Sequence, residues 1–525
     1  METVARRAGR REWVGLVVLA LPCLVYAMDL TVLNLAVPQL SADLEPSSAQ
    51  LLWIVDVYGF LVAGLLVTMG TLGDRIGRRR LLLLGAAGFG AASVLAASAT
   101  SATMLIAARA LLGVAGATLA PSTLSLIRNM FADPRQRTVA IAVWISSFSA
   151  GGAIGPLAGG VLLEWFWWGS VFLLAVPVMA MLLALGPFLL PEFRDPAAGR
   201  PDPLSAVLSL AAVLPVIYGL KQLAQDGLGW PPALSIVAGL ALGVVFVRRQ
   251  QRLADPLLDL RLFANRAFSA SLVTNTLSFF VGFGTLLFIA QYLQLVLGLS
   301  PLRAGLWMLP SSAAFIVGSM LAPLLARRAR PAVAIVAGLA LSAVGFGLLT
   351  QIDGAAGLAV LVASSVVFSL GLAPVDTLAA DLTVGAAPPE RAGAASALSE
   401  TSAELGGALG IAVLGSVGAA VYRGQMTDAI PVGTPPQAAE AARDTLGGAV
   451  AAAGELPGQL GAALLDAARH AFTQGLELAA AVSAALAVAV AVLTAVLLQG
   501  VRPSAQPQQD PDRSRQRGEA GRGAP

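Results

Sequence analysis

The sequence predicts an all-α membrane protein whose chain crosses the bilayer many times. Of its 525 residues, 57% are hydrophobic and only 12% are charged, which is not the composition of a soluble globular protein. Apolar runs of the length needed to span a bilayer, about 20 residues, recur along the chain with short polar breaks between them. A transmembrane β-barrel would instead show alternating segments of roughly ten residues. These observations predict a polytopic helical bundle.

The apolar runs and their breakers define fourteen candidate spans. Polar segments at 191–203 and 249–267 set the seventh and eighth spans apart, so we expect two six-helix bundles plus two extra central helices. The spans are 13–36, 51–71, 81–98, 103–126, 138–161, 170–190, 204–223, 232–248, 268–295, 303–325, 332–350, 357–383, 394–421 and 474–499.

This reading divides the chain into five parts: an N-terminal segment at 1–12, a six-helix bundle at 13–190, a linker with two extra helices at 191–267, a second bundle at 268–501, and a tail at 502–525. The tail is too polar to bury a core, so we expect it to be disordered. The second bundle includes an Ala-rich loop at 422–473, which we expect to form a short helical hairpin that gates the outer mouth.

The basic residues indicate how the chain is oriented. If the N-terminus with Arg6, Arg7, Arg10 and Arg11 is cytoplasmic, most arginines fall in segments on the same side. Lys221, Arg303, Arg423, Arg443 and Arg469 are then the basic residues outside. This asymmetry predicts a multi-pass protein of the cell membrane with both termini cytoplasmic. The basic charge is therefore topological, and we expect no nucleic-acid partner.

Composition also argues against several kinds of chemistry. One cysteine, Cys23, and one histidine, His470, do not suffice for a metal-ligand cluster, and no nucleophile motif is present. The only lysine, Lys221, lies between Leu220 and Gln222, so the chain has no phosphate-binding Gly-Lys-Ser/Thr loop. We expect no enzyme activity, no metal and no nucleotide cofactor. A proton gradient remains as the energy source.

Three ionisable residues are expected at one depth in the first bundle. Asp29 lies about 12 Å and Asp56 about 9 Å from the outer boundary at a helical rise of about 1.5 Å per residue, and Arg109 lies at a similar level. Acids inside a membrane are costly and usually functional. Arg109 could keep one carboxylate ionised and leave the other to titrate. A purely structural buried ion pair is the alternative.

Span 13 adds Glu400 and Glu404, which are four residues apart and therefore share a helix face. Two carboxylates this close in a medium of low dielectric resist double ionisation, so one of them is expected to hold a proton. The pair suits a proton or a cation. The alternative for Glu400 is a solvated position where the helix begins. Asp376 and Asp381 in span 12 are weaker candidates.

Two glycine-containing segments are candidates for conformational change. The turn GTLGDRIGRRR at 70–80 follows span 2, and the segment GGAIGPLAGG at 151–160 lies in span 5. Glycines every fourth residue let a second helix approach closely, and the proline kinks the span; by physics alone this predicts ordinary helix packing. The residues concerned are Gly70, Asp74, Arg75, Gly77 and Arg78 in the turn, and Gly151, Gly155, Pro156 and Gly159 in span 5.

These segments resemble the major facilitator superfamily, and in particular its fourteen-helix drug:proton antiporters. The turn at 70–80 is similar to the family's loop signature. The segment around Arg109, RALLGVAGATLAP, is similar to the family's fourth-helix segment, and the segment at 151–160 is similar to its antiporter motif. MDLTVLNLAVP at 28–38 resembles the first-helix signature, and PPERAGAASAL at 388–398 the segment that enters helix 13. The resemblance implies the major facilitator fold and makes the glycine segment a sign of exchanging, outward transport.

The resemblance implies proton-coupled export of lipophilic, cationic drugs or antiseptics by alternating access, with Asp29, Asp56, Arg109, Glu400 and Glu404 in proton coupling. We expect a monomer in the lipid bilayer whose partners are protons and one small amphipathic molecule. A dedicated exporter of a self-made antibiotic or metabolite is the first alternative; a membrane-embedded enzyme and a scaffold are remote ones. Substrate contacts are expected from Glu400, Glu404, Asp56, Trp53, Tyr58, Tyr26 and Phe148, because aromatic rings attract organic cations.

Overall fold

The computed structural model describes residues 8–194, 202–226, 229–253, 256, 258, 260–352, 357–387 and 392–498. Fourteen helices in these ranges are long and apolar enough to cross a membrane, which confirms the predicted number of spans. The tail at 502–525 and most of the N-terminal segment lie outside the described residues, so the expectation of a disordered tail stays a prediction.

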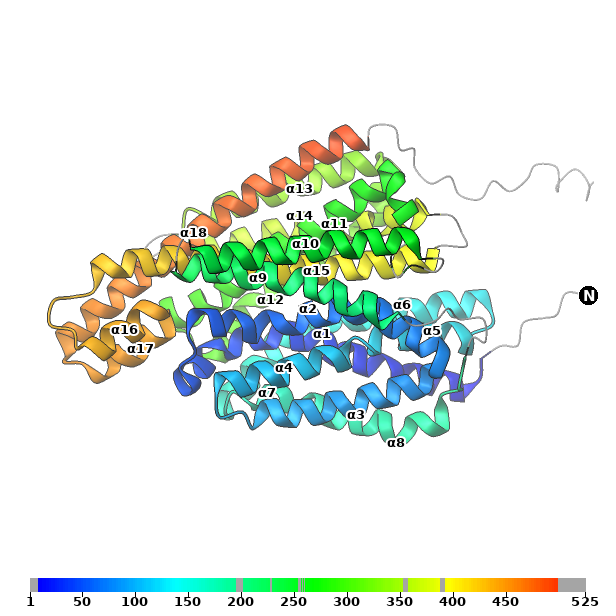
Figure 1. Ribbon diagram of the computed structural model, residues 1–525, viewed down its shortest axis with the longest axis horizontal. Helices are drawn as coiled ribbons and strands as arrows, with labels where there is room; N and C mark the ends of the chain where they lie inside the picture. The colour runs from blue at the N-terminus through cyan, green and yellow to red at the C-terminus, as the bar shows by residue number, and fades with distance from the viewer. Residues whose placement is uncertain are drawn as a thin grey trace, which may run out of the picture.

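The first bundle is formed by α1 to α8. Its members are α1 (Arg10–Leu44), α2 (Ser48–Ile76), α3 (Arg78–Ala97), α4 (Ala102–Gly116), α5 (Leu119–Met130), α6 (Pro134–Trp165), α7 (Ser170–Leu173) and α8 (Ala175–Leu189). Together, α4 and α5 make up the fourth span, and α7 and α8 the sixth. Figure 1 shows this bundle in blue and cyan along one side of the molecule.

The second bundle follows the extra helix pair, which is α9 (Pro203–Asp226) and α10 (Trp230–Arg252). The second bundle contains η1 (Leu260–Ala264), α11 (Arg266–Gln291), the π-helical turn η2 (Tyr292–Val296), α12 (Pro301–Arg328), α13 (Pro331–Leu349), α14 (Gly357–Gly385), α15 (Ala392–Ala429) and α18 (Gly458–Leu497).

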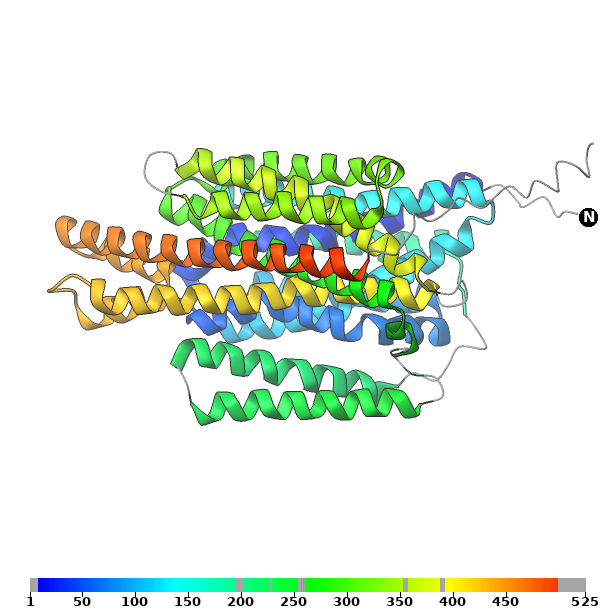
Figure 2. The same ribbon diagram turned by 90° about the horizontal axis from the view of Figure 1, so that it is seen from above.

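The extra helix pair is central in the sequence but peripheral in space. Figure 2 shows α9 and α10 side by side at one edge of the molecule. In the apolar, membrane-spanning stretch of each helix, 22% of the residues of α9 and 11% of those of α10 are buried, compared with 61% for α2. The pair therefore presents most of its apolar surface outward, as a lipid-facing hairpin would.

The predicted external hairpin exists as α16 (Pro436–Asp444) and α17 (Leu446–Glu455). The loop expected at 422–473 is shorter than predicted, because α15 continues to Ala429 and α18 already begins at Gly458. The hairpin extends beyond the bundles at the left of Figure 1. We call this side the hairpin end, and the opposite side, where α1 begins and α18 ends, the terminal end.

The hairpin also contacts the first bundle. The Ser48 hydroxyl at the start of α2 donates to the backbone carbonyl of Asp444, and a Cβ on Gly447 would lie 2.8 Å from that of Ser41. The phenol of Tyr422 in α15 donates to the carbonyl of Ala442 at 2.7 Å. The hairpin thus bridges both bundles, although gating by it stays a prediction.

The two bundles meet closely toward the hairpin end. The Gln294 side chain of η2 donates to the carbonyl of Leu35 in α1 at 3.0 Å, and the Leu302 amide of α12 donates to the Glu164 carboxylate of α6 at 3.3 Å. Toward the terminal end, Figure 1 shows the outer helices of the two bundles diverging. The structure is therefore closed at the hairpin end.

Candidate functional site

A hydrogen bond between two side chains, Tyr26 of α1 and Glu404 of α15, joins the bundles. The Tyr26 phenol donates a hydrogen bond of 2.6 Å to Oε1 of Glu404. Tyr26 is 3% exposed, whereas Glu404 is half-buried. Because Tyr26 is the donor, the contact suits an ionised Glu404, and it links the bundles near the middle of both helices.

Glu400 lies one helical turn before Glu404 and is exposed, even though its helix runs through the bundle. No lysine, arginine or histidine among the described residues lies within 4.0 Å of either carboxylate. The predicted common face is therefore present, and the exposure of Glu400 fits a site open toward the terminal end. Asp376 of α14 is likewise without a cationic partner among these residues.

Aromatic rings surround the Tyr26–Glu404 contact. The Tyr26 ring centroid lies 5.9 Å from those of Tyr58 and Phe148, and Phe148 lies 4.8 Å from Trp144. The structure thus brings together four of the expected substrate contacts, Tyr26, Tyr58, Phe148 and Glu404, and substrate binding by them stays a prediction. A carboxylate beside several aromatic rings is the chemistry that binds organic cations. We call these four residues with Glu400 the acid–aromatic site.

Arg109 holds the carboxylate of Asp29 in the first bundle. One guanidinium nitrogen lies 2.5 Å from the Asp29 carboxylate, and two others donate to the carbonyls of Ile54 and Val55 at 3.0 and 3.4 Å. The guanidinium also lies 4.6 Å from the Tyr58 ring centroid. The predicted proximity of Asp29 and Arg109 is confirmed, and the guanidinium also contacts Tyr58 of the acid–aromatic site.

Asp56 does not lie in the expected place. Its carboxylate pairs with Lys221 of α9, whose Nζ lies 3.0 and 2.9 Å from the two oxygens. The expectation that Lys221 is an external loop residue is wrong: its side chain is 2% exposed, inside a membrane helix. Trp53 accompanies Asp56, with its ring 4.0 Å from Nζ. Asp56 and Trp53 thus face the extra helix pair rather than the acid–aromatic site.

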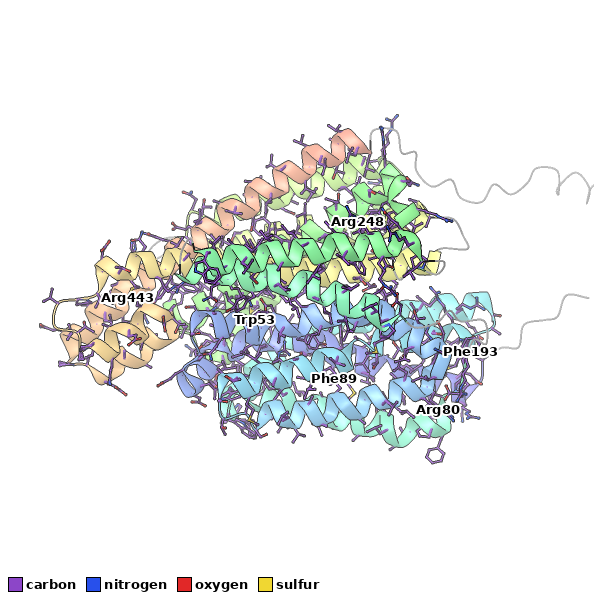
Figure 3. The ribbon with its side chains drawn as sticks, viewed as in Figure 1. Trp53, Arg80, Phe89, Phe193, Arg248 and Arg443 are labelled. Carbon is purple, nitrogen blue, oxygen red and sulfur yellow. The ribbon has the colours of Figure 1, made fainter. Side chains whose placement is uncertain are left out.

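The turn after α2 is a charged clamp at the terminal end. Asp74 pairs with Arg78 at 2.6 Å, and Arg78 also donates to the carbonyl of Pro121 in α5 at 3.3 Å. Gly77 has φ +113°, a conformation that favours glycine. Glu192, which follows α8, accepts from the Arg79 amide at 3.1 Å. The turn therefore ties four helices of the first bundle together; Figure 3 shows nearby Arg80 and Phe193 at this end.

The glycine stripe of α6 packs against α1 of its own bundle. A Cβ on Gly151, Gly155 or Gly159 would approach Leu24, Thr31 and Val32 to within 2.9 Å or less. The neighbouring Pro156 instead meets the second bundle, because its carbonyl oxygen lies 2.4 Å from a Cβ built on Gly305 of α12. The predicted close helix packing is confirmed, and the same segment also forms part of the closed contact between the bundles.

A separate pocket lies between the bundles near this closed contact. Thr31 and Pro156 line it from the first bundle, and Trp307, Ser311 and Ser365 from the second. No acidic residue lines this pocket.

Sequence reasoning missed the roles of Lys221 and Glu192. For Lys221 a signal was present, because the lysine falls inside the apolar run 204–223. Only distance along the chain hid its partner, since Asp56 lies 165 residues earlier. For Glu192 no signal distinguishes it from other polar residues of its segment.

Two six-helix bundles that meet around ionisable groups at mid-membrane define a secondary transporter. The chain belongs to the Major Facilitator Superfamily, whose family model matches residues 19–411.

Several curated relatives cover nearly the whole chain. The multidrug efflux pump LfrA of Mycolicibacterium smegmatis is 48% identical over 476 residues, 91% of this chain and 94% of its own. The methyl viologen resistance protein SmvA of Salmonella typhimurium is 38% identical, covering 88% and 93% of the two chains. The tetracenomycin C resistance and export protein of Streptomyces glaucescens is 33% identical, covering 90% and 89%.

Solved structures support the fold. A bacterial homologue of the human lysosomal transporter Spinster, in an inward-facing and unoccupied conformation, aligns with a TM-score of 0.65 at 18% identity, covering 95% of this chain and 100% of the other. The peptide transporter POT aligns with a TM-score of 0.59 at 16% identity, over 92% and 95% of the two chains.

Proposed function

We propose that the protein is a proton-coupled antiporter that exports lipophilic cations by alternating access. The observation that carries this proposal is the acid–aromatic site: Glu404 and Glu400 have no cationic partner among the described residues and lie beside the rings of Tyr26, Tyr58 and Phe148. The names of LfrA and SmvA, a multidrug pump and a methyl viologen resistance protein, support it.

The distribution of arginines supports a cytoplasmic terminal end, with the protein in the cell membrane. Arg78, Arg79 and Arg80 lie at that end, where the Asp74 turn is found. The hairpin end is then external and closed, so the structure is inward-facing. In this state Glu400, which is nearer the terminal end of α15, is exposed, and Glu404 lies half-buried one helical turn further in, so a drug would reach the site from the cytoplasm.

The site's chemistry suggests how the two ligands exchange. When Glu404 gives its proton to the cytoplasm, the carboxylate accepts the Tyr26 hydrogen bond and attracts an organic cation to the aromatic rings. Binding neutralises the charge, which lowers the cost of closing the site toward the cytoplasm. After the bundles rock, an external proton neutralises Glu404 and releases the cation outside. The protonated site then returns inward.

Asp29 and Arg109 have a different part in this cycle. The Arg109 guanidinium compensates the charge of the Asp29 carboxylate and holds Tyr58 in place by the contact between guanidinium and ring. We therefore assign proton exchange first to Glu404 and Glu400. Asp29 acts as the counter-ion that positions Arg109, a narrower role than the sequence suggested.

The proton gradient supplies the work, worth about 1.4 kcal/mol per pH unit and about 2.3 kcal/mol per charge at 100 mV. No nucleotide, metal or covalent chemistry takes part in the proposed cycle. The protein works as a monomer in the bilayer, since both bundles of one chain form the acid–aromatic site.

A dedicated exporter of a self-made antibiotic is the second candidate. The pocket beside Trp307, Ser311 and Ser365 favours it, because hydroxyl and apolar groups without an acid suit an uncharged molecule. The names of the relatives that export tetracenomycin C or confer puromycin resistance agree with this candidate.

The test is transport in inverted membrane vesicles with an imposed proton gradient. We expect uptake of the fluorescent cation ethidium, its collapse by a protonophore, and its loss in Glu404→Gln, with Glu404→Asp retaining part of it. Uptake that ignores the protonophore would contradict proton coupling. Preferential transport of an uncharged dye, unaffected by Glu404→Gln, would favour the second candidate instead.

A further inference from the structure

The extra helix pair covers the seam where the two bundles meet. Helix α9 packs on both α2 of the first bundle and α15 of the second. Against α2, Leu210 lies so close that a Cβ on Gly64 would come within 2.4 Å of it. Against α15, Ile217 packs in one buried cluster with Ala408 and Ala412. One helix therefore contacts two bodies that must move relative to each other during transport.

The contact with α2 is anchored by a buried ion pair. Lys221 Nζ lies 2.9 Å from Asp56 Oδ2 and 4.0 Å from the centroid of the Trp53 ring. Neither charged side chain is more than 2% exposed. Trp53 and Asp56 are three residues apart, on the α2 face toward α9, and Figure 3 marks Trp53 beside the extra helix pair.

The contact with α15 has a different chemistry. It is apolar: Ile217 of α9 packs with Ala408 and Ala412 of α15, and Leu405 and Leu409 of α15 pack partly buried against them. Apolar contacts have no preferred partner atom, whereas a buried ion pair loses its stabilisation when its groups separate. Arg109 of α4 is also close to this part of α2 and belongs to the first bundle, because its guanidinium donates to the carbonyl of Val55 at 3.4 Å.

We propose that Lys221 is a positioning residue that fixes the extra helix pair to the first bundle and keeps the Asp56 carboxylate out of proton exchange. The pair α9–α10 then moves with the first bundle and slides over α15 as the bundles rock. This inference rests on the proposed transport function, and it removes Asp56 from the proton-coupling residues expected from the sequence.

A set of charge variants tests the role of Lys221. Asp56→Asn or Lys221→Met alone leaves one buried charge without its partner, so each should lower proton-driven ethidium uptake by more than about tenfold. The double variant D56N/K221M removes both charges and should restore uptake to within about threefold of the wild type, with the same number of protons moved per cation. Lys221→Arg should retain most of the activity.

The double variant also separates this inference from direct coupling by Asp56. If Asp56 carried the transported proton, D56N/K221M would stay inactive or lose its dependence on the proton gradient although it folds, which would overturn the proposal. Circular dichroism and the elution profile of the purified variants establish folding. If the wild type itself does not transport ethidium, the proposed function fails. The thermal stability of the same variants then tests the ion pair: each single variant should be less stable than the wild type, and the double variant should recover the lost stability.

Cross-linking tests the proposed motion in a chain whose only cysteine, Cys23, is replaced by alanine. A short thiol-specific linker between Gly64→Cys and Leu210→Cys joins α9 to α2 and should leave transport within about twofold of the uncrosslinked control. The same linker between Ile217→Cys and Ala412→Cys joins α9 to α15 and should stop it. Arrest by the first link with activity after the second would show that the pair moves with the second bundle, against the proposal.

Discussion

The acids of the two bundles differ in their partners. In the first bundle, Asp29 pairs with Arg109 and Asp56 with Lys221, so each carboxylate faces a buried cation. In the second, Glu400 and Glu404 face no lysine, arginine or histidine within 4.0 Å among the described residues. A cation partner compensates the charge of a buried carboxylate, whereas a carboxylate without one needs a proton or a cationic substrate to compensate its charge in the membrane interior.

This difference assigns separate tasks to the bundles. In the proposed cycle the acids of the first bundle stay in ion pairs, with Arg109 and with Lys221 of α9, and the second bundle exchanges the proton. Among the described residues, the phenol of Tyr26 in the first bundle donates a hydrogen bond directly to Glu404 in the second. We therefore propose that movement between the bundles is coupled to the charge on Glu404 rather than to the charges on Asp29 or Asp56.

The largest expected effect is at Glu404. Glu404→Gln removes the proton from the exchange, which at 100 mV removes about 2.3 kcal/mol of driving force, or about fiftyfold in the drug gradient. Uptake of ethidium into energised vesicles measures it. Glu400→Gln is the matched variant and should cost less, because Glu400 is exposed and does not contact Tyr26. Equal losses would mean that the two acids work as one coupled pair.

A second effect is expected when the Arg109 pair is broken. Arg109→Ala leaves Asp29 buried and unpaired and frees the carbonyls of Ile54 and Val55, at a cost of about 3–5 kcal/mol in stability. Asp29→Asn should cost less, because Arg109 keeps its carbonyl partners. Thermal unfolding of the purified protein measures both. A larger loss in Asp29→Asn than in Arg109→Ala would contradict the assignment of Asp29 as a counter-ion.

A third prediction concerns the closed contact that holds the site inward-facing. Gly305→Val places a side chain against the Pro156 carbonyl, where a Cβ would lie 2.4 Å away, and such overpacking costs about 1–3 kcal/mol. Because the strain arises only where the bundles touch, the population should shift outward-facing. Gly152→Val is the control, since a Cβ there meets nothing within 4 Å.

Cysteine labelling from the two sides of the membrane, with a reporter cysteine at Ser311, reads out that shift. External labelling of Ser311→Cys should rise in Gly305→Val and stay unchanged in Gly152→Val. An equal rise in both variants would show that the strain does not act through the contact between Pro156 and Gly305.

The smallest effect is expected in the extra helix pair, at Asp202 where α9 begins. Partial burial acts to raise the pKa of Asp202, but hydrogen bonds from Ser205 and Arg249 outweigh it and hold the pKa below its ordinary value. A lowered carboxyl pKa stabilises the fold above the pKa of the unfolded chain, and this contribution is lost as pH falls through the folded value. Asp202→Asn should therefore lower thermal stability slightly at pH 7 and by less at pH 3.

The comparison of wild type and Asp202→Asn by thermal unfolding at both pH values measures this effect. Ser209→Ala is a suitable control on the same helix, because its hydroxyl only donates to the carbonyl of Ala206. A difference as large at pH 3 as at pH 7 would point to lost packing rather than lost charge.

Much of the fold could be predicted from the sequence, because long apolar runs identify the membrane spans. The fourteen spans and the proximity of Asp29 and Arg109 were predictable, since helical rise alone fixes depth. The direction in which each side chain points was not predictable. Asp56 shares a depth with Asp29 but faces α9, because the rotation of α2 is decided by the packing of Trp53 and Phe60 against the extra helix pair.

The extent of the external segment was the other error. Residues after 422 and before 473 are rich in alanine, and alanine continues a helix equally well inside and outside a membrane. Helices α15 and α18 therefore run on beyond the expected boundaries to Ala429 and back to Gly458. The bond between Tyr26 and Glu404 could not be foreseen either, because 378 residues separate the partners.

Proton release on drug binding tests the division between the bundles most directly. Purified protein in weak buffer near pH 7, with a pH-indicator dye, receives tetraphenylphosphonium, and the protons released per bound cation are counted. The wild type and D56N/K221M should both release protons, and Glu404→Gln should bind the cation weakly without release. Full release from Glu404→Gln, or its loss in a folded D56N/K221M, would contradict proton exchange by the second bundle.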